Sequence, residues 1–273
     1  MAKIGIFDSG FGGLSILKHI VELMPQYDYV YLGDSARVPY GNRSSETVYN
    51  FTCEALDFLF TQGCDLVVLA CNTASSDALR KIQQEFLPSK YPSKKVLGVI
   101  IPACETAVET SMNGNIGLIA TKGTVSSKAF DREISNRKSD VNLFSIACPL
   151  LVPIIENGEH LDNELLDLIL NKYLSYFIDK NIDTLILGCT HYALIENDIS
   201  RVLGTHIAVI NEGPVVAKKL KIYLENHSEI SSKLSTKETV NFYTTDFPLG
   251  FEELGKRFFG RDIEATKIQL QEL

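Results

Sequence analysis

The stretch Leu-Val-Val-Leu-Ala-Cys-Asn-Thr-Ala-Ser at residues 66–75 has a counterpart in Thr-Leu-Ile-Leu-Gly-Cys-Thr-His-Tyr-Ala at residues 184–193. Each begins with an apolar run of strand length and reaches a cysteine, after which polar side chains favour the start of a helix. Open parallel sheets bind ligands just beyond the carboxyl ends of their strands. We therefore expect Cys71 and Cys189 at strand ends and helix N-termini, where a thiol is drawn toward the thiolate. Two such thiols in one cleft predict an enzyme that takes a proton with one sulfur and returns it with the other.

A second pair of segments extends this similarity between the two halves of the chain. Residues 4–10 and 116–123 each have the pattern of a strand that ends in a turn, and each precedes one of the cysteine segments. The fold class predicted is α/β, with two similar doubly wound, mostly parallel-sheet domains and the active site in the cleft between them. We expect residues 1–97 and 210–273 to form the first domain and residues 98–209 the second.

The predicted strands and helices alternate along the chain, which is typical of parallel sheets covered by helices. Helices are expected at 13–24, before Pro25, and at 44–62, before Gly63. The polar segment 228–238 is expected to be a surface linker, and the last strand and helix are expected to rejoin the first domain. The strands are predicted at 3–8, 28–33, 65–70, 95–100, 115–119, 141–146, 183–188, 206–210 and 239–244.

Net charge, apolar runs and cysteine spacing argue against several classes of protein. The chain has 273 residues, of which 45% are hydrophobic, and its formal net charge of −8 argues against bulk binding to nucleic acid or anionic membranes. It contains no apolar run of about 18 residues, and only Met1 and Ala2 precede the first strand, so neither a membrane span nor a signal peptide is predicted. The six cysteines form no C-x-x-C pair, which favours a cytoplasmic protein with reduced thiols and neither a metal site nor disulfides.

The chain resembles bacterial glutamate racemases, within the aspartate/glutamate racemase family, over essentially its whole length. Besides the two cysteine segments, five blocks carry the resemblance. They are Asp-Ser-Gly-Phe-Gly-Gly at 8–13, Gly-Asp-Ser-Ala-Arg-Val-Pro-Tyr-Gly at 33–41, Thr-Lys-Gly-Thr-Val at 121–125, Val-Pro-Ile-Ile-Glu at 152–156 and Phe-Tyr-Thr-Thr-Asp at 242–246. Aspartate-specific relatives typically carry Thr-Glu after the second cysteine, where this chain has Thr190 and His191. Ala193 departs from the proline usual in the family.

The resemblance implies cofactor-independent interconversion of L- and D-glutamate, which supplies D-glutamate for peptidoglycan synthesis. Cys71 and Cys189 would be the two bases, and Asp8 would support Cys71 while His191, with Glu156, would support Cys189. A neighbouring carboxylate raises the pKa of a thiol, so amides or His191 would have to stabilise the thiolate. We also expect a homodimer and activity without a UDP-linked muramyl activator. The substrate-binding residues implied are Asp8, Ser9, Tyr40, Gly41, Asn72, Thr73, Thr121, Thr124, Thr190 and His191.

Other readings of the sequence stay open at this point. The glycines at 10, 12 and 13 follow a strand as in a dinucleotide fold, but Ser15 stands where the third glycine is needed and no P-loop lysine follows. A racemase of another acidic amino acid such as aspartate, or a non-catalytic amino-acid binder, would use the same cleft. Asp34 and Arg37 are expected to pair and fix the loop that presents Tyr40. The cysteines expected to be ordinary core residues are Cys53, Cys64, Cys104 and Cys148.

Overall fold

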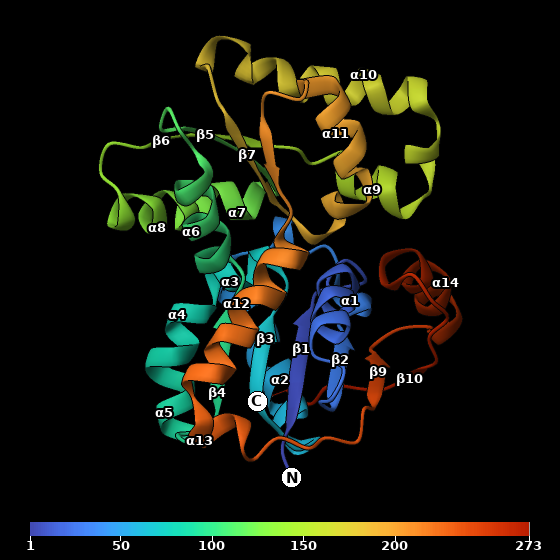
Figure 1. Ribbon diagram of the computed structural model, residues 1–273. Coiled ribbons are helices and arrows are strands. Elements are labelled where there is room, and N and C mark those ends of the chain that lie inside the picture. The colour runs from blue at the N-terminus through green and yellow to red at the C-terminus, as the bar shows by residue number, and fades with distance from the viewer. Residues whose placement is uncertain (273) are drawn as a thin grey trace.

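The computed structural model describes residues 1–272, which form two parallel sheets, one above the other in Figure 1. The first sheet has the strand order β10-β9-β2-β1-β3-β4 and the second the order β6-β5-β7-β8, and every pairing is parallel. The strands are β1 (Lys3–Asp8), β2 (Tyr29–Gly33), β3 (Cys64–Leu69), β4 (Lys95–Gly98), β5 (Asn115–Ala120), β6 (Asn142–Ala147), β7 (Thr184–Gly188), β8 (Ala208–Ile210), β9 (Val240–Thr244) and β10 (Ala265–Lys267).

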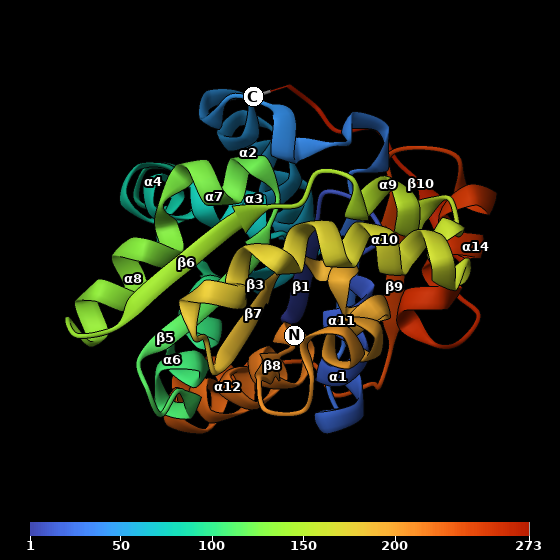
Figure 2. The same cartoon turned by 90° about the horizontal axis from the view of Figure 1, so that it is seen from above.

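Helices lie on both faces of each sheet (Figure 2). The longer ones are α1 (Leu14–Leu23), α2 (Ser45–Thr61), α6 (Ile100–Thr110), α8 (Ala129–Arg137), α10 (Asn163–Leu174), α11 (Glu196–Leu203), α12 (Glu212–Asn226) and α14 (Pro248–Phe259). The shorter ones are α3 (Asn72–Asp77), α4 (Leu79–Lys81), α5 (Leu87–Lys90), α7 (Lys122–Ser127), α9 (Leu151–Glu156) and α13 (Ser228–Ser231). Short 3₁₀ segments are η1 (Ser35–Arg37), η2 (Tyr40–Asn42), η4 (Glu159–Leu161), η5 (Ser175–Lys180) and η6 (Thr190–Ile195), and η3 (Ile82–Phe86) is a short π-helix.

The strand order confirms the duplicated α/β fold predicted from the sequence. The order β2-β1-β3-β4 in the first sheet is repeated as β6-β5-β7-β8 in the second. Each half therefore places its first and third strands side by side at the centre of its sheet. Cys71 follows β3 and Cys189 follows β7, so the two cysteines occupy equivalent positions in the two halves.

Successive side chains of the central strands point to opposite faces of the first sheet, and each face packs against a different layer of helices. Ile4 and Ile6 of β1 pack in the cluster formed with α1, α12 and α14, whereas Phe7 packs in the cluster formed with α2. Burial on both faces explains why these strands are almost continuously apolar. The second sheet is covered by α6 and α8 on one face and by α9, α10 and α11 on the other.

The C-terminal segment returns to the first sheet, where β9 pairs with β2 (Figure 1). The sequence pattern does not indicate β10, because its three residues are mostly exposed and carry no apolar alternation. The segment 228–238 is not a simple surface linker, because it contains α13 and the buried Leu234, which pairs with Ala2 in a parallel bridge. The boundaries proposed for the two domains stay predictions.

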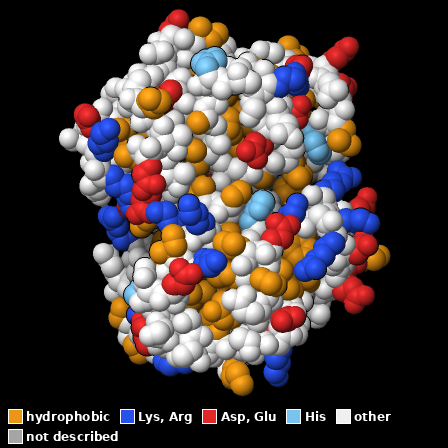
Figure 3. All heavy atoms as spheres, viewed as in Figure 1, with side chains coloured by type: hydrophobic (Ala, Val, Ile, Leu, Met, Phe, Trp, Pro, Cys, Tyr) orange, Lys and Arg blue, Asp and Glu red, His pale blue; other side chains and the backbone are white. Residues whose placement is uncertain are grey.

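The surface of the described residues carries a mixture of charges. Acidic and basic side chains are interspersed over the face seen in Figure 3. No helix within residues 1–272 is long and apolar enough to cross a membrane.

Candidate active site

A cavity of about 270 Å³ opens where the carboxyl ends of the central strands of the two sheets meet. Both Cys71 and Cys189 line it. Of the other residues implied by the resemblance, those that line the cavity are Ser9, Tyr40, Gly41, Asn72, Thr73, Thr121, Glu156, Thr190 and His191. Asp8 and Thr124 are absent from its wall and lie buried close to it. The fold therefore gathers segments that follow β1, β2, β3, β5, β6 and β7 around one small space.

Cys71 is the N-cap of α3, as the sequence predicted. Its sulfur accepts the backbone N–H of Ala74 at 3.5 Å and lies 3.5 Å from the hydroxyl of Ser9. These contacts favour the thiolate, but burial and the nearby Asp8 carboxylate outweigh them and raise the pKa of the Cys71 thiol to about 11. The thiol is therefore protonated near neutral pH, contrary to the expectation that the helix N-terminus lowers its pKa.

Cys189 precedes a 3₁₀ turn, η6, rather than the α-helix expected from the sequence. Its sulfur lies 3.9 Å from Nδ1 of His191, whose Nε2 lies 2.9 Å from the Glu156 carboxylate. Burial raises the pKa of the Cys189 thiol well above its ordinary value, and Cys71, Asp8 and Glu212 add to the increase. The prediction of a lowered pKa is wrong here too, since desolvation exceeds the stabilisation given by the backbone N–H of His191.

The contacts of Glu156 and His191 form a line of side chains that leads to Cys189. Glu156 ends α9 and is partly exposed, whereas His191 is almost fully buried. The carboxylate fixes one ring nitrogen and leaves the other facing the sulfur. Such an arrangement can hold the imidazole ready to stabilise a thiolate on Cys189.

Asp8 ends β1 beneath the cavity. One carboxylate oxygen accepts the backbone N–H of Gly10 at 2.9 Å, and Oδ1 has no hydrogen-bond partner within residues 1–272. Burial raises the pKa of Asp8, and His191 acts in the opposite direction. A buried carboxylate with an unsatisfied oxygen is costly, and a cationic ligand group would relieve that cost.

Three threonine hydroxyls join the two halves at one end of the cavity. Thr73 from α3 lies 3.1 Å from Thr121, which caps α7 and donates to Thr124 at 3.0 Å. Thr124 is thus a buried partner of Thr121 rather than part of the wall. Hydroxyls at helix starts are suited to binding carboxylates.

Gly12 lets the loop after β1 lie against the second cysteine segment. A Cβ atom at position 12 would lie 2.2 Å from the Thr190 hydroxyl and 2.6 Å from Nδ1 of His191. Any side chain there would displace the imidazole, so this glycine is required by close approach rather than by nucleotide binding.

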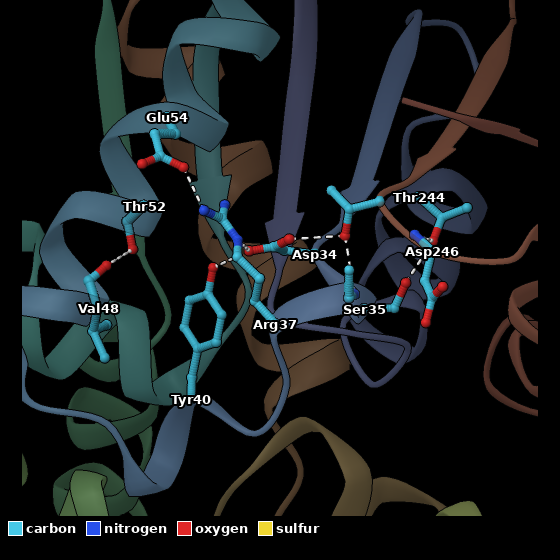
Figure 4. Close-up of polar contacts among 11 residues, drawn as sticks. Asp34, Ser35, Arg37, Tyr40, Val48, Thr52, Glu54, Thr244 and Asp246 are labelled. Atoms are coloured by element: carbon cyan, nitrogen blue, oxygen red, sulfur yellow. Dashed lines mark hydrogen bonds and ion pairs between the residues drawn. The ribbon is translucent and has the colours of Figure 1, made fainter. Parts of the chain in front are cut away.

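Figure 4 shows the network that holds Tyr40 against the cavity. The Tyr40 hydroxyl donates to Asp34 at 2.5 Å, and Nε of Arg37 donates to the same carboxylate at 2.6 Å. Arg37 also pairs with Glu54 of α2. The pairing of Asp34 with Arg37 was predicted from the sequence and is confirmed. Thr245, just after β9, donates to Asp34 at 2.8 Å, so the C-terminal segment supports this loop.

Three residues around the site were not predicted from the sequence. Cys148, assigned to the core, lines the cavity, and Lys122 contributes an exposed cation to its wall. Glu212 begins α12, is buried, and accepts a hydrogen bond from Asn72 at 2.6 Å. The sequence could have indicated Glu212, because it follows the end of β8 and the N-cap Asn211. The carboxyl ends of the strands of both sheets meet at the cavity.

The buried carboxyl of Glu212 predicts a pH-dependent stability. Burial raises the pKa of Glu212 from 4.5 to about 8, so the folded protein binds more protons than the unfolded chain between those pH values. We expect wild type to lose stability relative to Glu212→Gln as pH rises from 5.5 to 8.5, by up to about 1.4 kcal/mol per pH unit. Urea unfolding of both proteins at the two pH values measures this. A stability difference that is constant or shrinks with rising pH would contradict it.

Comparisons with known proteins agree with this geometry. The family model for Asp/Glu/Hydantoin racemase matches residues 4–220. The chain belongs to this family. It is 39% identical to a glutamate racemase of Geobacter metallireducens over 94% of this chain and 92% of the relative, and 41% identical to that of Aquifex aeolicus over 96% of each.

Solved structures place the chain among the glutamate racemases as well. A racemase of Bacillus anthracis, isoform RacE1, superposes with a TM-score of 0.90 at 32% identity over 98% of each chain. A racemase of Francisella tularensis, solved with D-glutamate, superposes with a TM-score of 0.89 at 33% identity over 100% of this chain and 99% of that one. The chain is therefore an amino-acid racemase, an isomerase.

Proposed function

We propose that the chain interconverts L- and D-glutamate by proton transfer at Cα between two cysteines, without a cofactor. The observation that carries this proposal is the placement of Cys71 and Cys189 on one cavity, at equivalent strand ends of two similar halves. A single base would tend to return the proton to the face that it left. Two bases on opposite faces of Cα allow the configuration to invert.

The two cysteines together account for both protons that move in the reaction, one taken from Cα and one given to it. The thiolate of one cysteine takes the α-proton and becomes a thiol, while the electron pair of the broken C–H bond delocalises into the substrate carboxylate. The thiol of the other cysteine gives its proton to the opposite face of Cα and becomes the thiolate. The enzyme is then ready for the reverse reaction, which needs no further co-reactant.

The substrate itself would supply a positive charge that offsets the acidic groups of the site. Asp8 raises the pKa of both Cys71 and Glu212, and Cys71, Asp8 and Glu212 all raise the pKa of Cys189, so the site has an excess of acidic groups. The α-ammonium group of glutamate would offset this excess and favour one thiolate. The hydroxyls of Ser9, Thr73, Thr121 and Thr190 and the amide of Asn72 are the groups proposed to bind the remaining polar atoms.

The proposed product, D-glutamate, would serve peptidoglycan synthesis. Both cysteines must stay reduced for the chemistry, and all six cysteines are free thiols, which supports a cytoplasmic setting. The homodimer implied by the resemblance stays a prediction. Aspartate is the second candidate substrate, and it is separated from glutamate by the experiment that follows.

Incubation in D₂O without added cofactor tests both the substrate and the chemistry. We expect α-deuterated glutamate of both hands from either enantiomer, and little deuterium in aspartate, because the cavity is proposed to fit the longer side chain. Chiral chromatography with mass spectrometry measures both. Equal or faster exchange with aspartate would overturn the substrate, and binding of glutamate without α-exchange would overturn the proposed activity.

A further inference from the structure

Glu212 is a buried carboxyl group that the two-cysteine chemistry does not use. It is 3% exposed, as is Asn72, and the 2.6 Å hydrogen bond between them joins residues 140 positions apart. Asn72 begins α3 directly after Cys71, and Glu212 begins α12, the helix that leads from the second sheet back to the first (Figure 1). The contact therefore lies at the crossing between the two halves, beside a proposed base.

The hydrogen bond determines which end of the Asn72 amide is free. Nδ2 of Asn72 donates to Oε2 of Glu212, so the amide nitrogen is the end that faces Glu212. Oδ1 is then the end left over, and it is buried with no partner within residues 1–272. Asn72 lines the cavity, so this oxygen is an acceptor available to a ligand donor.

Glu212 and Asp8 each have a carboxyl oxygen that makes no hydrogen bond. Oε1 of Glu212 and Oδ1 of Asp8 are both buried and lack partners among the described residues. The two carboxyls are close enough to interact, since the charge on Asp8 raises the pKa of Glu212. Three unsatisfied acceptors beside two acidic groups favour a ligand group with several donors and a positive charge, such as the ammonium of an amino acid, and Asn72 is the one of the three residues that lines the cavity.

We infer that Glu212 is a positioning residue for recognition of the substrate's α-ammonium group: it orients Asn72 so that Oδ1 accepts from the ammonium. The positive charge of the bound ammonium favours the ionised form of Glu212, which then adds negative charge behind that contact. This inference rests on the proposed function, because it needs an amino-acid substrate in the cavity. Without Glu212 the Asn72 amide can rotate and present Nδ2, which cannot accept a hydrogen bond.

The substitution Glu212→Gln tests the inference, and Glu196→Gln is its control because Glu196 also accepts a hydrogen bond from an asparagine at the start of α12. Glu196→Gln changes a second Glu–Asn pair, in which Asn211 of the α12 N-cap donates to Glu196 at 2.6 Å. We expect Glu212→Gln to raise KM for both glutamate enantiomers about tenfold while kcat changes less than about threefold, as expected for a lost charge-assisted contact. Glu196→Gln is expected to leave both constants within twofold of wild type.

Inhibition by glutarate distinguishes a loss of ammonium recognition from a general loss of substrate binding in the cavity. Glutarate has both carboxylates of glutamate and no amino group, so its competitive inhibition constant should change less than twofold in Glu212→Gln. In the Asn72→Ala background, Glu212→Gln should raise KM less than threefold, because the residue through which it acts is gone. A parallel rise in the glutarate constant, an unchanged KM for glutamate, or fully additive effects would each overturn the inference.

The same assays separate failure of this inference from failure of the proposed function. Loss of the proposed function would appear as a wild-type enzyme without α-deuterium exchange on glutamate, or as unimpaired exchange after removal of either proposed base. A wild type that exchanges glutamate, inactive cysteine variants and a Glu212→Gln variant with wild-type KM would overturn only the inference. Thermal unfolding of each variant shows whether it is folded, and Glu212→Gln is expected to be at least as stable as wild type near neutral pH.

Discussion

Replacing Cys71 or Cys189 by alanine is expected to lower kcat/KM for glutamate by about 10³-fold or more, because each variant lacks one of the two proposed proton carriers. The loss must be equal in the two directions, since the enantiomers have equal free energy and the equilibrium constant is 1. Polarimetry or circular dichroism of the racemisation, started from each enantiomer, measures it.

The control for this experiment is a buried cysteine outside the cavity. Cys53 lies within α2 and is absent from the cavity wall, so Cys53→Ala should keep activity within about threefold. Cys148 is a poorer control because it lines the cavity. Racemisation at more than a tenth of the wild-type rate in Cys71→Ala or Cys189→Ala would overturn the two-base mechanism.

Asp8→Asn and His191→Asn are expected to lower kcat/KM by about 10²-fold each, the range typical of groups that assist proton transfer. Asp8 interacts with the Cys71 side through its charge, and His191 lies 3.9 Å from the Cys189 sulfur. The two substitutions should therefore make opposite proton transfers more rate-limiting, although they change kcat/KM equally in both directions.

Primary isotope effects with α-deuterated substrate distinguish the two sides. The family resemblance implies that Cys71 faces the D-enantiomer, so Asp8→Asn should enlarge the effect for D-glutamate and His191→Asn the effect for L-glutamate. Competition between deuterated and protonated substrate measures each one. Isotope effects that are identical in both variants and both directions would mean that Asp8 and His191 only position the substrate.

Much of the fold follows from local pattern. The apolar runs before Asp8, Cys71 and Cys189 are strands because both faces of each sheet are covered, and the following polar residues begin helical turns. Nine strands were predicted near their observed positions, whereas β10 was missed because it is short and has no apolar alternation. The pairing of Leu234 with Ala2 does not follow from local pattern, because it joins residues far apart in the sequence.

The sequence by itself determined the duplicated α/β fold and the cysteine-containing strand ends, because strand period, helix starts and glycine turns are local properties. Only the tertiary structure decided that Glu156 reaches His191 and that Glu212 holds Asn72, since these pairs lie 35 and 140 positions apart. It also decided the direction of the pKa of Cys71 and Cys189. A helix N-terminus lowers the pKa of a thiol, but burial among acidic groups raises the pKa by more than the helix lowers it. The extent of burial depends on which distant parts of the chain pack around the sulfur.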